Sequence, residues 1–414
     1  MSTMQTAAEA GSASRLQRLI DEVAGFNILA VPEARSSGSA LRATGRNGVI
    51  GWQVREALHR FDIVLHPPSA AGGMKAENSV GESAGWLDLR WLLIPRDFLA
   101  RPDREPPATL LDPERSQRFT MQEATFRFGD GSDGFRSFGT GRTFPAFYGG
   151  GLRLLAAAVG NVIEGFGKFR GHEGNYTLCG EIDPERGFVG HGVVRILDSQ
   201  GNLRTAADLP PMQTRQSPDP DATYLLFGAQ KGPGQENSFS FGSDGQIRGA
   251  NILTQLRLLR LGFAAGGSEG FRANDLRIGE PIGLEVGFGR GSEPGASQAG
   301  SALKPFLFEG VAKYTFSDAS GREIGAVTTN VLEGRRFDVR LPAAPDEPAL
   351  RFGFFGPIVL GTGCFAGAEG MFYGSSGSIL KPPPAEHVIT HFYVARLHDP
   401  DGRFRVAVGK GEGR

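Results

Sequence analysis

The length, composition and charge of the chain limit the classes of function open to it. Its 414 residues suffice for two or three domains, and 40% are hydrophobic, so sizeable cores can form. The 44 basic and 45 acidic residues leave a net charge of −1, without a dense run of lysine or arginine. Because no global field draws such a chain to nucleic acid or to an anionic membrane, we expect no nucleic-acid partner.

Cysteine usage and the N-terminus bear on the compartment. Cys179 and Cys364 lie far apart and form neither a disulfide framework nor a CxxC metal motif, which indicates a reducing environment. The first residues lack the basic start and apolar core of a secretory signal. No stretch reaches the apolar length of a membrane span. We therefore expect a cytoplasmic protein without a membrane span.

Helical character is scarce and lies near the N-terminus. Ser14 can cap a short helix that Gly25 ends, with an apolar stripe formed by Leu16, Leu19, Ile20 and Val23. Residues 49–61 are a second possible helix with less regular apolar spacing. We therefore predict an N-terminal helical extension over residues 1–60, packed on the β-structure that follows or on a neighbouring subunit.

From residue 61 onward the sequence predicts strands separated by turns. Apolar and β-branched runs, such as residues 86–95 and 222–230, are bounded by Gly, Pro, Asp and Asn. Residues 100–116 are rich in proline and residues 289–305 in Gly, Ser and Ala, which is typical of linkers or long loops. The predicted fold class is mainly β, with a short N-terminal helical segment.

One glycine-rich pattern, GxGxFxGxEG, occurs twice. Its copies run from Gly165 to Gly174 and from Gly361 to Gly370, 196 residues apart. A phosphate-binding loop would end on Gly-Lys-Ser/Thr and open a helix. The first copy instead leads into the aromatic and β-branched residues that begin at Asn175, with no helix cap. We therefore expect the glycines to lead into a strand.

Two further blocks repeat in the same order around the motif. Each reads as a strand followed by a polar turn, and they pair Ala124–Gly134 with Ala312–Gly321 and Val193–Arg204 with Val394–Arg405. Three matching blocks in one order indicate two copies of one β unit of domain size. The predicted division is a first β-barrel over residues 61–215 and a second over residues 216–414.

The motif has a structural interpretation that needs no ligand. Glycine at every second or fourth position strips one face of a strand, so that the strand can bend at a barrel corner or let another backbone approach. Phe169 and Phe365 would then fill the interior. The repeated carboxylates would accept backbone N–H bonds or pair with the repeated arginines, with catalysis as the alternative; these residues are Glu173, Glu369, Arg195 and Arg396.

The two copies differ in their polar residues. His172, Glu173 and Tyr176 form a compact group in the first copy, whereas the second has Ala368 and Phe372 at the positions of the histidine and tyrosine. Such residues can supply an acid, a base or a hydrogen bond to a developing enolate. The alternative is an exposed hairpin tip. If one cavity is active, we predict that these three residues are catalytic.

His387 and His391 lie four residues apart, a spacing that binds zinc on a helix when a glutamate lies between them. Here the intervening residues are Val, Ile and Thr, and no third ligand is evident. We expect no metal and no cofactor.

The two glycine windows resemble the GxGxFxGAxG segment of the allene oxide cyclase and dirigent-like β-barrels. The alanine of that segment is kept as Ala368 but is His172 in the first copy. The families' catalytic carboxylate, proline and tyrosine do not align with this chain, and none is carried over. The resemblance implies two tandem lipocalin-like or allene oxide cyclase-like antiparallel β-barrels with apolar cavities for hydrophobic or aromatic small molecules.

Two classes of function then remain. One is an isomerase or cyclase that acts on a hydrophobic small molecule inside a β-barrel cavity. The other is a non-catalytic small-molecule binding or dirigent-type orienting protein, and a homo-oligomer is compatible with both. We take four residues of the repeated blocks as candidate substrate-binding residues: Phe169, Arg195, Phe365 and Arg396.

Overall fold

The protein is built almost entirely of strands. The structure, a computed structural model, describes residues 23–32, 40–43, 50–95, 118–148, 151–183, 187–231, 235, 237–241, 247–291, 306–341, 344–379 and 388–406. Residues 1–22, which hold most of the expected first helix, lie outside the described residues. Val23 and Gly25, placed at the end of that helix by the sequence, belong to a strand.

Eight strands of the N-terminal half close into an antiparallel barrel. In chain order they are β1 (Val23–Pro32), β3 (Ile50–Leu65), β4 (Ala76–Pro95), β5 (Arg118–Phe128), β6 (Asp133–Tyr148), β7 (Gly151–Phe166), β8 (Glu173–Asp183) and β9 (Gly187–Leu197). Each pairs with the next, and β1 closes the sheet by pairing with both β3 and β9. The short β2 (Ala40–Ala43) extends the sheet beyond β3.

The helix expected at residues 49–61 is wrong. These residues form most of β3, which pairs with β1 on one side and β4 on the other. Its inward residues alternate with period two, from Trp52 to Leu58, so the strand pattern prevails over the partial helical spacing. The strands of the first barrel therefore begin at Val23, before the expected boundary at residue 61.

The C-terminal half repeats the same barrel. Its strands are β11 (Ala222–Gln230), β13 (Ile247–Arg260), β16 (Arg277–Gly291), β17 (Phe306–Ser317), β18 (Glu323–Leu341), β19 (Ala344–Gly363), β20 (Gly370–Ile379) and β21 (Val388–His398). Here β11 closes the sheet by pairing with β13 and β21, and β12 (Ser238–Phe241) extends it beyond β13. The two eight-stranded barrels thus share one strand order.

The two glycine motifs occupy equivalent positions, between β7 and β8 and between β19 and β20. A Cβ atom on Gly165 would lie 1.8 Å from the Phe169 carbonyl oxygen, and one on Gly361 would lie 2.0 Å from that of Phe365. Gly167 and Gly363 both adopt a left-handed backbone, with φ of 58° and 59°. The motif is therefore a tight turn that no larger residue can form.

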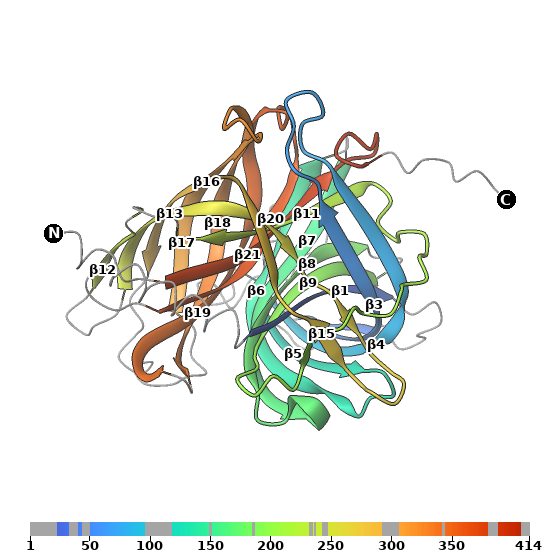
Figure 1. The fold of residues 1–414 in the computed structure, drawn as a ribbon. Helices are drawn as coiled ribbons and strands as arrows, with labels where there is room; N and C mark the ends of the chain where they lie inside the picture. The colour runs from blue at the N-terminus through green and yellow to red at the C-terminus, as the bar shows by residue number, and fades with distance from the viewer. Residues whose placement is uncertain are drawn as a thin grey trace.

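Each barrel extends one hairpin to the other barrel, the hairpin between the second and third of its eight strands. The β3–β4 hairpin of the first barrel rises to one end of the second barrel (Figure 1), where the Ala76 amide donates to the Phe404 carbonyl at 2.8 Å. In the opposite direction, the β13–β16 connection covers one end of the first barrel. It contains β14 (Phe263–Ala264) and β15 (Arg272–Asn274), which pair into a small sheet with β10 (Arg204–Thr205).

Each exchanged hairpin meets the glycine motif of the other barrel. Lys168, within the first motif, donates through Nζ to the Phe271 carbonyl oxygen at 3.0 Å. Its counterpart Cys364 faces Gly73 of the first hairpin, where a Cβ would lie 3.1 Å from the cysteine Cβ. The two contacts are therefore reciprocal.

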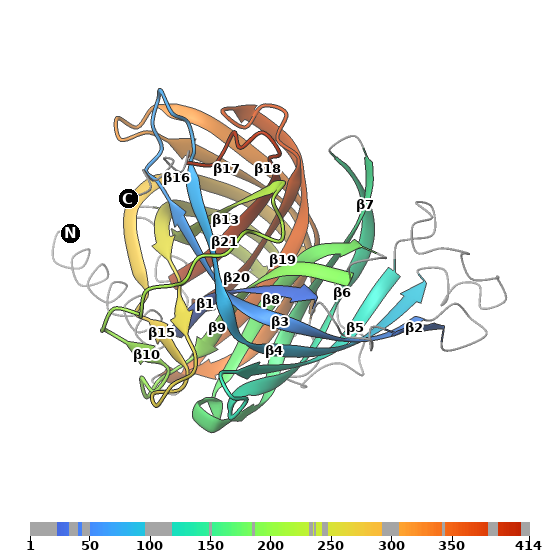
Figure 2. The same ribbon diagram turned by 90° about the vertical axis from the view of Figure 1, so that its right-hand side faces the viewer.

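Among the described residues, three buried clusters form the core. One fills the first barrel and one the second, and the third lies between the two barrel walls. Figure 2 shows β20 beside β8 and β9, which form part of this contact. The inter-barrel cluster includes Leu29, Phe61, Cys179, Val193, Leu226, Phe355, Tyr373, Phe392 and Val394.

Candidate functional site

The closed end of each barrel is filled by aromatic rings. Phe169 packs against Phe128 and Phe271, with ring centroids 5.5 and 4.7 Å apart. Phe365 packs in the same way against Phe316 and Phe404, at 5.3 and 5.5 Å. Both phenylalanines of the motif are buried, as the structural interpretation expected. Their role in substrate binding stays a prediction.

The structure does not bring His172, Glu173 and Tyr176 into one cluster. His172 Nε2 lies 3.2 Å from a carboxylate oxygen of Asp198, and this hydrogen bond raises the histidine pKa. Glu173 is exposed and accepts a hydrogen bond from Arg351 of the second barrel at 3.1 Å. Tyr176 lies inside the first barrel, fully buried. Catalytic roles for the three stay predictions.

Asp198 organises the turn after β9. Its fully buried carboxylate accepts from the backbone amides of Asn202 and Leu203 at 2.8 and 3.0 Å, and Arg204 Nε donates to it at 3.2 Å. Asp399 holds the equivalent turn of the second barrel, with Thr223 donating at 2.7 Å. His172 thus joins a turn that the second barrel builds without a histidine.

Tyr176 has an apolar environment, and within the described part of the chain its hydroxyl has one hydrogen bond, with Ser137 Oγ at 3.3 Å. Its ring packs on Phe126 at 5.0 Å, and burial raises the pKa of the phenol well above its usual value. A Cβ on Gly160 would lie 2.2 Å from the ring. This glycine is therefore needed to make room for the tyrosine.

Arg195 and Arg396 lie between the barrels. Arg195 donates to Thr390 Oγ1 at 2.8 Å, and its guanidinium lies 4.9 Å from the Phe392 ring centroid. Arg396 donates to Asp219 at 2.9 Å. The expected pairing of Glu173 with Arg195 is not formed, because the glutamate turns to Arg351 across the interface. Substrate binding by the two arginines stays a prediction.

A buried cluster of hydroxyl groups around a single carboxyl, inside the second barrel, is the strongest candidate site. The carboxylate of Glu285 accepts from Thr254 Oγ1 at 2.5 Å, and its two oxygens lie 2.8 and 2.9 Å from the Tyr393 hydroxyl. Tyr314 lies directly opposite Glu285 on the next strand. Burial raises the pKa of the Glu285 carboxyl to about 7, although hydrogen bonds from these three neighbours favour the charged form.

His391 adjoins this cluster. Its imidazole stacks on the Tyr393 ring, with centroids 5.0 Å apart and planes 11° apart. Neither ring nitrogen has a hydrogen-bond partner among the described residues. Burial, reinforced by the positive charge of Arg195, lowers the pKa of His391 to about 3, so the ring is neutral at physiological pH. Carboxyl, phenol and imidazole groups therefore meet within an aromatic wall.

Sequence reasoning missed Glu285 because the strand around it has an inverted pattern. The apolar residues Leu284, Val286 and Phe288 are 37%, 40% and 61% exposed, whereas the glutamate between them is 4% exposed. The pairing of the neighbouring strands identifies Glu285 as an inward residue, and this pairing is known only from the structure. In the first barrel, Leu87 takes the position of Glu285. The residue opposite Leu87 is Glu56, which is also buried and takes the position of Thr254. Each barrel thus buries one carboxyl at the same level.

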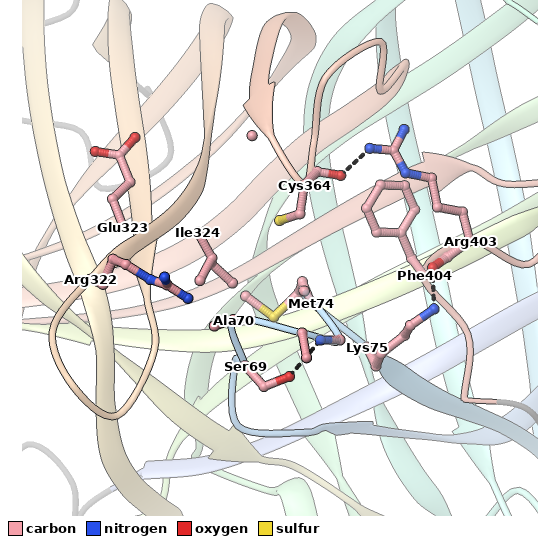
Figure 3. Close-up of a pocket in the computed structure, with 14 residues that line it drawn as sticks. Ser69, Ala70, Met74, Lys75, Arg322, Glu323, Ile324, Cys364, Arg403 and Phe404 are labelled. Atoms are coloured by element: carbon pink, nitrogen blue, oxygen red, sulfur yellow. Dashed lines mark hydrogen bonds between the residues drawn. The ribbon is translucent and has the colours of Figure 1, made fainter.

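A pocket of about 640 Å³ lies where the first hairpin meets the second barrel (Figure 3). Its walls combine hairpin residues 69–75 with the β17–β18 turn and with Cys364 and Arg403. Two of its cations already have protein partners: Lys75 Nζ donates to the Arg403 carbonyl at 2.5 Å, and Arg403 donates to the carbonyls of Cys364 and Ala366. Desolvation raises the pKa of the Cys364 thiol, which disfavours a nucleophilic thiolate.

Across the described ranges, no group of three or more His, Cys, Asp or Glu side chains could hold a metal ion. None of the helices described here has the length and apolar character needed to cross a membrane.

Comparison with known proteins gives little further information. No family model and no curated protein matches the chain. Among solved structures, one match is described as "Structure of the pterocarpan synthase dirigent protein GePTS1". The identity is 15%, the match covers 45% of this chain and 98% of that chain, and the TM-score is 0.22. A similarity of this size carries no inference about activity.

Proposed function

We propose that the second barrel is the active site of an isomerase or cyclase that acts on a hydrophobic small molecule by proton transfer. The observation that carries this proposal is the buried Glu285, with a pKa of about 7 and hydrogen bonds from Tyr393 and Thr254. A carboxyl group with this pKa can both take and return a proton near neutral pH. An ordinary surface glutamate would be too weak a base for this purpose.

The surroundings of the cluster favour an apolar or aromatic substrate. The Tyr393 ring packs against Phe227, Phe354 and Phe372, with centroids 5.8, 5.5 and 5.4 Å apart. Such walls bind flat hydrophobic molecules, and the few polar groups fix their orientation. His391 supplies one such group, since its ring nitrogens are available for a ligand.

The proposed chemistry is an allylic proton shift on an unsaturated ketone. The Glu285 carboxylate removes a proton from the carbon next to the carbonyl, and the C–H electron pair moves into the enolate. The neutral His391 ring donates a hydrogen bond to the enolate oxygen. The resulting Glu285 acid returns the proton to the far carbon of the double bond, so that atoms and charge balance.

The three candidates of the first barrel stay a separate prediction. His172, Glu173 and Tyr176 have different partners and do not share a contact network. The second-barrel cluster has direct hydrogen bonds between its members, and it is therefore the arrangement that we favour.

Turnover of hydrophobic β,γ-unsaturated ketones by the purified full chain tests the proposal, with formation of the conjugated enone followed by ultraviolet absorbance. Glu285→Gln should lower kcat by about 100-fold or more, as expected for loss of a general base. Glu280→Gln, which alters an exposed glutamate on the same strand, should leave the rate unchanged. In the wild type, the rate should rise with pH through about 7, because the ionised carboxyl is the base.

Two results would contradict the proposal. One is full activity in Glu285→Gln. The other is the absence of turnover together with tight binding of the fluorescent probe 1-aminoanthracene, which would favour the non-catalytic binding or orienting protein.

A further inference from the structure

The first barrel contains an aromatic cluster of a different kind, near the end away from its glycine motif. Trp52 and Trp91 meet edge to face, with ring centroids 5.1 Å apart. Phe188, which comes from β9, also contacts Trp91 at 5.1 Å. The three rings are buried and come from three strands of the barrel.

Beside these rings lie buried polar atoms without partners. Gln122 is 0% exposed, yet neither its amide nitrogen nor its amide oxygen has a hydrogen-bond partner in the described part of the chain. The same holds for the indole nitrogen of Trp91 and the hydroxyl of Thr120, which are 3% and 2% exposed. Burial of such groups without hydrogen bonds is unfavourable, because each has lost its bonds to water without replacement. A bound group that pairs with them would offset this cost.

These residues face one another through the strand register. Trp52 lies opposite Trp91, Trp91 opposite Gln122, and Gln122 opposite Gly139, so the four form one ladder across β3 to β6. Gly139 has no side chain, and a Cβ there would lie 2.9 Å from the Val159 carbonyl oxygen and 3.3 Å from the Tyr176 hydroxyl, so that Tyr176 bounds the site on this side. Ala156 and Ala158 on the next strand are also small.

The barrel scaffold does not require this ladder. Gly85 and Gly283 occupy equivalent positions at a bulge in the two barrels. Counted from these glycines, the positions of Trp52, Trp91 and Gln122 are occupied in the second barrel by Ala250, Gly289 and Gly310. Two tryptophans and a glutamine have therefore replaced three small residues in an otherwise shared fold. Structural need does not explain unpartnered polar groups at a site where the sister barrel has none.

We propose that this part of the first barrel binds a neutral, planar aromatic compound that carries an adjacent donor and acceptor, such as a lactam or an aromatic carboxamide. The Gln122 amide would donate to the ligand carbonyl and accept from its N–H, and the Trp91 N–H or the Thr120 hydroxyl would pair with the carbonyl as well. The rings of Trp52, Trp91 and Phe188 would stack on the aromatic plane. The proposal does not rest on the function of the second barrel.

Tryptophan fluorescence reads this site directly. The chain has three tryptophans, and Trp86→Phe leaves only Trp52 and Trp91, both in the cluster. In this background, the lactam carbostyril should quench fluorescence with saturation. Naphthalene has the same shape without the polar pair, and it leaves the Gln122 amide unpaired. It should therefore bind more weakly by a factor of about ten or more.

A variant pair separates the polar contact from apolar binding. Gln122→Leu should weaken carbostyril binding about tenfold or more and leave naphthalene binding unchanged or tighter. Met121→Leu, on the outer face of the same strand, should change neither. If Gln122→Leu fails to fold, Thr120→Val provides a second variant, for which weaker carbostyril binding is expected.

The proposal is overturned if carbostyril does not quench, if it binds no more tightly than naphthalene, or if the folded Gln122→Leu protein binds it as the parent does. The first two results would indicate that the polar groups hold only water. Because the assay follows tryptophans of the first barrel, failure here and failure of Glu285 in the turnover assay are distinguishable.

Discussion

At the scale of single residues, burial sets the protonation states inside and between the barrels. Burial lowers the pKa of His191 to about 3 and that of Arg195 to about 9, and it raises that of Glu285 to about 7. His191 nevertheless has a partner, the Tyr373 hydroxyl at 2.7 Å. Ionisable groups at such positions make stability depend on pH in directions that can be stated.

Glu285→Gln should change the pH dependence of stability. The folded protein holds the Glu285 proton more tightly than the unfolded chain, so this stabilisation is complete below about pH 4.5 and is lost as the pH rises to about 7. Glutamine does not titrate. The free energy of unfolding of the variant should therefore gain about 3 kcal/mol over that of the wild type between these pH values. Urea unfolding at several pH values measures it, and a difference independent of pH would contradict the assigned environment.

His172→Ala should destabilise the protein more in mild acid than in mild base. The hydrogen bond to Asp198 raises the pKa of the histidine, so its stabilisation is complete below about pH 6.5 and is lost as the pH rises through the folded-state pKa. Melting temperatures of variant and wild type at about pH 5.5 and about pH 8.5 give the comparison. A loss equal at both pH values would contradict the assigned pairing.

At the scale of elements, the exchanged hairpins complete cores that they do not belong to in sequence. Phe271 comes from the β13–β16 connection, yet it is fully buried among Phe26, Phe128 and Phe169 of the first barrel. Its backbone amide donates to Asp133 at 2.9 Å. Because the contact is long-range, the hairpin stabilises the barrel that it caps.

Phe271→Ala should lower the stability of the first barrel, although the residue lies in the second half of the chain. Loss of a fully buried ring costs about 3 to 5 kcal/mol. Hydrogen exchange should show faster exchange in the β5–β6 turn, next to Asp133, than in the β17–β18 turn. Phe288→Ala, at an exposed phenylalanine, should change neither turn. Faster exchange confined to the second barrel would show that the hairpin does not support the first.

At the scale of the whole molecule, the two barrels are joined along their walls. Their walls share an apolar cluster, and polar bonds cross it, such as those from Asn175 to Ser375 at 2.9 Å and from Thr177 to the Gly374 carbonyl at 2.8 Å. Buried polar bonds of this kind fix the register of two surfaces as well as holding them together. Together with the exchanged hairpins, they make each half incomplete alone.

The halves 1–215 and 216–414 should therefore be insoluble or only partly folded when they are expressed separately, because each exposes its half of the interface and lacks one cap. Expressed together, they should copurify and show the circular dichroism of the full chain. Asn175→Leu should weaken this association, whereas the exposed Leu92→Asn should not. Two separately stable, monomeric halves would show that the barrels are independent domains.

The sequence alone determined the β class and the duplication, since alternation and repeated blocks are local properties. The strand at residues 50–65, the hairpin exchange and the burial of Glu285 were decided only by tertiary structure. A strand's inward face depends on the bulge and the partners that set its register, and at Glu285 these turn Leu284 and Val286 outward. Pairing between residues about 200 apart in sequence, such as Asn175 and Ser375, leaves no local pattern to recognise.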